Sequence, residues 1–260
     1  MKLSTVVLII GGIVLGYLSI KLLLVAVVIG SIYYLTKRYE NFSNIATFLT
    51  ADEMKDLIEQ DKDGFLFSLT KYDLIARKVQ SPIEYKEKAK KLTSNFTEDE
   101  KRRIERIIKS IKYKDLTGFG INNDNWDALP LKFGKCEYEE GYPHTRGDVI
   151  VLNNRSLSQP DSDLADTIIH EKVHIYQKKY PDSVRAYLLS KGFTIEGRRD
   201  SHPRARANPD LDDYIYKSPE GKIHISEYTS EYPAGIWDIT GTTESEHPLE
   251  MLAYLISKNY

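Results

Sequence analysis

The sequence predicts an α+β fold with an N-terminal transmembrane helix, a small helical region, and a last domain that sets a short sheet beside a long helix. Three observations predict it. A nearly continuous apolar run comes first, capping signals then start amphipathic segments, and strand and helix patterns alternate after Lys114. The expected parts are an anchor over residues 1–36, a helical region over residues 37–113 and a domain over residues 114–260.

Composition limits the classes of function. The chain has 260 residues, of which 41% are hydrophobic and 28% charged, so a sizeable folded domain remains once the apolar run is set aside. The formal net charge is −2, and such a mild acidic balance argues against nucleic-acid binding as the main function. The single cysteine, Cys136, cannot form an internal disulfide, which excludes a disulfide-stapled secreted scaffold.

Residues 6–35 form an apolar run that a single charge, Lys21, interrupts, and about 20 apolar residues already span a bilayer as a helix. Lys21 is expected to extend its long side chain to the membrane surface. No small-residue cleavage site follows the run, so we expect a retained, single-pass anchor. Lys37 and Arg38 follow it, whereas only Lys2 and the amino terminus precede it, which favours the cytoplasmic side for the soluble part.

The region from residue 44 to 112 is expected to be helical and polar. Thr50 with Glu53, and Thr97 with Glu100, have the spacing of a capping box ahead of apolar residues at helical intervals. Two amphipathic helices are therefore predicted here. The calcium-loop-like stretch at residues 61–64 lacks the glutamate that such a loop needs at its last position, so we interpret it as a turn.

After Lys114, residues 148–152 form a short apolar run between turn residues, which is typical of a strand. Apolar residues at helical spacing then predict a helix from about Ser162 to the residues before Pro181. A further helix is predicted after Pro248, because proline is well placed in a first helical turn.

The helix that starts near Ser162 contains His170, Glu171 and His174 in an H-E-x-x-H motif. Residues four apart lie on one helical face, so both imidazoles can reach one metal ion, with the glutamate beside them. Zn²⁺ fits these ligands, since it lowers the pKa of its water toward ~7 while a carboxylate takes the water's proton. We therefore predict that His170 and His174 bind zinc and that Glu171 is the catalytic general base.

The motif and the strand before its helix resemble the zincin superfamily of metallopeptidases. In zincins an edge strand runs beside the active-site helix and binds extended peptide, and the resemblance implies this role for residues 148–152. No third histidine follows His174 at the metzincin offset, so the resemblance implies a gluzincin-like glutamate ligand on a later helix. Glu250, in Glu250-Met-Leu-Ala253, fits that pattern.

Other ligands and the oxyanion donor stay open. Glu246, His247 and Glu231 compete with Glu250 as the third ligand. The residues that compete as donor to the oxyanion are Tyr228, Tyr232, His224 and Tyr254. A basic cluster is interpreted as a solvated loop, with binding of an acidic partner as the alternative, and consists of Arg198, Arg199, Arg204 and Arg206.

These patterns together predict a membrane-anchored zinc metallopeptidase, a hydrolase that cleaves a peptide or protein substrate, with a membrane contact through residues 6–35 and no nucleic-acid partner. The alternative is a catalytically inactive zincin-fold protein with a structural or interaction role. An intact Glu171 favours the enzyme, because a structural zinc site is usually closed by four protein ligands. In its overall sequence pattern, with the apolar N-terminal run included, the chain is also similar to predicted metallopeptidases of large DNA viruses. This similarity implies association with a membrane or a viral particle.

Overall fold

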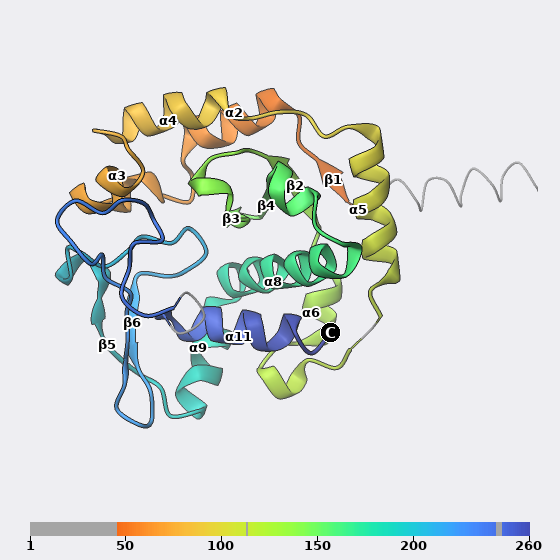
Figure 1. Cartoon of the computed structure of the whole chain (residues 1–260). Helices are drawn as coiled ribbons and strands as arrows, with labels where there is room; N and C mark the ends of the chain where they lie inside the picture. Colours follow the sequence, from red (N-terminus) through yellow and green to blue (C-terminus); the bar gives the residue numbers. More distant parts are fainter. Residues whose placement is uncertain (1–45, 113, 243–245) are drawn as a thin grey trace, which may run out of the picture. The chain divides into compact units, whose positions relative to one another are not determined.

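The computed structural model describes residues 46–112, 114–242 and 246–260, which belong to one compact unit (Figure 1). This part has a mixed α/β fold, built from helices and two small sheets. The anchor predicted over residues 6–35 lies outside the described residues. In the part that the structure covers, no helix has both the length and the apolar character needed to cross a bilayer.

The helices differ greatly in length, from short turns to the long helix that carries the H-E-x-x-H motif. They are α2 (Ala51–Gln60), α3 (Lys71–Ala76), α4 (Pro82–Lys91), α5 (Glu98–Ser110), α6 (Asn123–Asp127), α7 (Asn154–Leu157), α8 (Asp161–Lys179), α9 (Pro181–Ser190) and α11 (Pro248–Ser257). The strands are β1 (Thr47–Phe48), β2 (Lys132–Lys135), β3 (His144–Arg146), β4 (Val149–Leu152), β5 (Thr194–Arg198), β6 (Tyr214–Lys217) and β7 (Ile223–His224).

Both predicted capping boxes are confirmed. The Thr50 hydroxyl accepts from the Glu53 N–H at 3.2 Å, and the Glu53 carboxylate accepts from the Thr50 N–H at 2.7 Å. The same pair of bonds at Thr97 and Glu100 begins α5. Local side-chain chemistry therefore sets the start of both helices, because each box satisfies backbone N–H groups that the first helical turn leaves free.

The larger sheet has the strand order β1-β2-β4-β3. β1, β2 and β4 are parallel, whereas β3 returns antiparallel to β4 through a tight turn at Gly147, whose φ is 59°. The strand predicted over residues 148–152 is therefore confirmed as β4, but its implied place at the sheet edge is wrong. β3 forms that edge, since the turn at Gly147 folds residues 144–146 onto the outer side of β4.

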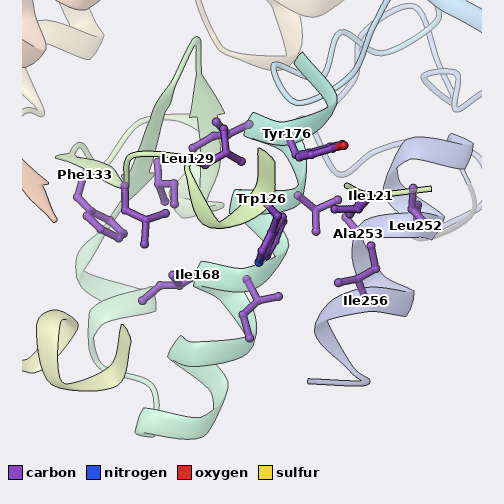
Figure 2. Close-up of a cluster of buried hydrophobic side chains, with 14 of the residues drawn as sticks. Ile121, Trp126, Leu129, Phe133, Ile168, Tyr176, Leu252, Ala253 and Ile256 are labelled. Carbon is purple, nitrogen blue, oxygen red and sulfur yellow. The ribbon is translucent and has the colours of Figure 1, made fainter. Parts of the chain in front are cut away.

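The main hydrophobic core lies between the larger sheet and helices α5, α8 and α11. Figure 2 shows Phe133 of β2, Ile168 and Tyr176 of α8, and Leu252 and Ile256 of α11 in one cluster of buried side chains. α8 and α11 lie side by side (Figure 1). Packing of an apolar stripe on each helix thus fixes α11 against the motif-bearing helix.

Buried ion pairs connect residues before position 113 with strand β3 and with the segment between β2 and β3. The Arg77 guanidinium, after α3, donates two bonds of 2.8 Å to the Glu139 carboxylate. Arg146 of β3 donates to Asp61 at 2.8 Å and to Asp63 at 2.7 Å. With β1 in the sheet as well, the residues before and after position 113 share one folded unit.

Candidate metal centre

His170 and His174 lie one turn apart on α8, as predicted for residues at positions i and i+4. Their Nε2 atoms are 3.1 Å apart, and the two ring centroids are separated by 4.8 Å. The Nε2 atoms of both imidazoles therefore lie on one helical face, close enough to bind one metal ion.

Glu250 of α11 completes the cluster. His247 is the N-cap of this helix and Pro248 its first residue, so the third position after the cap carries Glu250 toward α8. Its Oε2 lies 3.3 Å from Nε2 of His170 and 3.7 Å from Nε2 of His174. The three candidate ligand atoms all lie within 4.8 Å of one another, and no other group of three or more such residues occurs in the described chain.

The competing third ligands have other partners or positions. Glu246 pairs with the buried Arg206 guanidinium. His247 accepts from the Leu249 N–H through Nδ1 at 3.2 Å and contacts the Tyr214 carbonyl through Nε2 at 3.1 Å, so both ring nitrogens are in use. Glu231 lies exposed in a loop.

Gln177 sets the orientation of His174. Its Nε2 donates to the Leu249 carbonyl at 3.0 Å, which can only accept, so the amide oxygen is the atom 2.8 Å from Nδ1 of His174. Nδ1 of His174 must therefore carry a proton, so in the neutral ring the lone pair lies on Nε2, toward His170 and Glu250. Gln177 thus selects the tautomer that can bind a metal and links α8 to α11.

The charges of the cluster favour a cation. Burial raises the pKa of Glu250, but the neighbouring histidines outweigh burial and hold this pKa well below its usual range. Burial lowers the pKa of His174, yet Glu250 outweighs burial here too and raises this pKa to about 9. Without a metal, the cluster therefore retains a proton between histidine and carboxylate, and a divalent cation would compete with that proton.

Glu171 is buried beside the cluster, and its Oε2 has no hydrogen-bond partner among the described residues. Burial, together with the negative charge of Asp210, raises the pKa of Glu171 well above its usual range. A buried carboxylate oxygen without a partner needs a water, an ion or a substrate to satisfy it. This oxygen therefore fits a residue that acts on a bound molecule.

A pocket of about 300 Å³ opens onto His170, Glu171 and Glu250. Of the four candidate oxyanion donors, Tyr254 is the one that lines this pocket, with its ring centroid 4.5 Å from that of His170. Tyr228 is buried and donates to Asp73, whereas Tyr232 is 80% exposed. His224 lines a different pocket.

The basic cluster divides into two kinds of residue. Arg206 pairs with Glu246, and Arg199 pairs with Asp73 at 3.3 Å, so both belong to the folded interior. Arg204 is exposed and Arg198 is half-exposed. The solvated-loop interpretation is therefore wrong for Arg199 and Arg206, because acidic side chains distant in sequence hold them.

Several residues of the pocket and of the metal cluster were not identified from the sequence. Asn208 and Asp210 lie in an irregular segment, where no periodicity marks a functional position. His144 lies in β3, a strand whose buried residues are polar. Gln177 carried one usable signal, since it follows His174 by three residues and so shares its helical face.

Comparisons of this chain with protein-family models, with curated proteins and with solved structures found no match. The chemistry of the cluster is therefore inferred from its own residues. Two imidazole nitrogens and one carboxylate oxygen are a ligand set that catalytic zinc sites use, with one position left for water or substrate. The donor set, the tautomer of His174 and the unpartnered oxygen of Glu171 all fit such a site.

Proposed function

We propose that this chain is a membrane-anchored zinc metallopeptidase with a zincin-like, gluzincin-type catalytic domain. The observation that carries the proposal is the unpartnered Oε2 of Glu171 beside the convergent His170, His174 and Glu250. A purely structural zinc site needs no base, and it is usually closed by a fourth protein ligand.

The chain's own residues supply the other parts of the reaction. His170, His174 and Glu250 would hold zinc, which when bound polarises a peptide carbonyl and lowers the pKa of water. Glu171 takes the proton of the attacking water and then delivers it to the leaving amine. Burial of Glu171 keeps its carboxylate out of bulk water, which strengthens its interaction with the reacting atoms.

The test measures zinc content and cleavage of a peptide library with the full chain in mild detergent. Glu171→Gln should keep its zinc and lose cleavage by about 10²- to 10⁴-fold, because it removes the base and no ligand. Asp163→Asn, an equivalent change on an exposed position of α8, is the matched control and should keep full activity.

Two results would contradict the proposal. Full zinc occupancy in His170→Ala would contradict the assignment of His170 as a zinc ligand. A zinc-loaded wild type that cleaves no peptide would favour the inactive structural or interaction protein instead.

A further inference from the structure

The outer edge of β3 is already occupied. The Thr145 N–H donates to Oδ1 of Asp210 at 2.5 Å, and the Thr145 carbonyl accepts from the Lys178 ammonium at 3.0 Å. Both backbone groups therefore point away from β4 and toward side chains. In an antiparallel pair, alternate residues face outward, so Thr145 is the residue of β3 that would bind an added strand.

This edge adjoins the candidate metal centre. β3 is the last strand of the larger sheet and packs against α8. His144 of β3 lines the same pocket as His170 and Glu171. A peptide that extended the sheet next to the cluster would therefore need the backbone groups of Thr145.

The segment that blocks the edge, residues 206–210, is held in place by buried groups. The Ala207 N–H donates to Asp73 at 2.8 Å, and its carbonyl accepts from Arg77 at 2.9 Å. Asn208 donates to Glu250 at 3.0 Å. Displacing this segment would leave several buried polar groups unpaired, which opposes its removal.

An extended peptide commonly binds by adding a strand to an exposed sheet edge, with main-chain hydrogen bonds that give affinity. Here that route is closed, and the pocket that opens onto His170, Glu171 and Glu250 has about 300 Å³, at the small end of the range for ligand sites. The larger pocket, which His224 lines, does not include these three residues. We propose that the site takes short peptides of a few residues and does not bind long extended chains along β3. This inference rests on the proposed function, because it concerns the substrate of the same zinc site.

The test is the affinity of the zinc-loaded full chain, in mild detergent, for peptidyl hydroxamates of one, two, four and six residues, measured by calorimetry. Hydroxamates bind zinc without being cleaved, so this readout does not depend on catalysis. Affinity should change less than about threefold beyond two residues. Tightening of more than about tenfold between two and six residues would overturn the inference, since it requires contacts outside the pocket.

Two variants test the role of Asp210. Asp210→Ala frees the Thr145 N–H and should let the six-residue compound bind at least about threefold more tightly than the two-residue one. Asp210→Asn keeps an acceptor oxygen for the Thr145 N–H and should show the same dependence on peptide length as the wild type. A length dependence unchanged in Asp210→Ala would contradict the assigned role of this residue.

The outcomes also separate the two proposals. If short hydroxamates bind but no peptide is cleaved, the result would contradict the peptidase activity. It would still support a site for short ligands. Efficient cleavage inside long unfolded chains would support the peptidase and overturn the short-substrate inference. Failure to bind any hydroxamate would overturn both.

Discussion

Asn208 donates from Nδ2 to Oε1 of Glu250 at 3.0 Å, while Oε2 of the same carboxylate faces the two histidines. The same nitrogen lies 2.9 Å from Glu246. One amide therefore fixes the rotation of the carboxylate that would complete the metal site. Side chains that hydrogen-bond to a metal ligand orient that ligand and change the affinity of the site for the metal.

Asn208→Ala should weaken zinc binding by about 10- to 100-fold, because Glu250 loses the bond that orients it. Competition with a chelator measures this affinity. Asn154→Ala, on an exposed position of α7, is the control and should bind zinc as the wild type does. Equal affinity in the two variants would mean that packing alone orients Glu250.

Gln177→Leu should also reduce zinc affinity by about 10- to 100-fold, since His174 would no longer be held in its Nδ1-protonated tautomer. Gln177→Glu keeps an acceptor for Nδ1 and should retain more affinity than the leucine variant. Melting curves in chelator separate lost stability from lost affinity. Wild-type affinity in Gln177→Leu would exclude a role in positioning.

Arg77→Leu should lower the free energy of unfolding by about 3–5 kcal/mol, because Glu139 would stay buried without its counter-ion. Urea unfolding measures the loss. Arg102→Leu breaks an ion pair whose side chains are 66% and 92% exposed, and it should stay within about 0.5 kcal/mol of the wild type. Adding Glu139→Gln to Arg77→Leu should recover part of the loss.

Asp63 should make stability depend on pH under acidic conditions. Burial raises its pKa, but the Arg146 guanidinium outweighs burial and lowers this pKa from 3.8 to about 2. The carboxylate binds its proton less readily in the folded chain, so its contribution is complete above about pH 4 and is lost as the pH falls toward 2. With partial solvent screening the contribution is about 1–2 kcal/mol.

Asp63→Asn should therefore be less stable than the wild type at pH 6, by about this amount, with a difference that shrinks below pH 4. Unfolding curves in the presence of chelator measure it without interference from metal. A difference that stays constant from pH 6 to pH 3 would rule out this linkage.

Residues 6–35 should keep the full chain in membranes after an alkaline carbonate wash, because a spanning apolar helix is not released by charge repulsion. A chain that begins at residue 40 should remain in the supernatant. A mature amino terminus between residues 25 and 45 would instead identify a cleaved signal.

Much of the candidate site could be predicted because its signals are local. The H-E-x-x-H spacing needs only helical geometry, and Pro248 marks the start of the helix that carries Glu250. β3 could not be predicted, since His144, Thr145 and Arg146 are polar and their burial depends on partners as remote as Asp61 and Asp210.

Dependence on distant residues also explains why other parts of the fold could not be predicted. β1 has two residues, and its place in the sheet depends on pairing with β2, far along the chain. Asn208 and Asp210 carry no pattern of their own, because their roles come from Glu250 and Thr145. Interactions between distant residues decide such positions, and periodicity does not record them.

The ligand order along the chain has a consequence for biosynthesis. His170 and His174 leave the ribosome well before Glu250, and at about 5–20 residues per second the interval lasts several seconds. During that time α8 has no carboxylate partner from α11, and Gln177 lacks the carbonyl of Leu249. A nascent chain would thus bind zinc poorly until α11 has folded against α8.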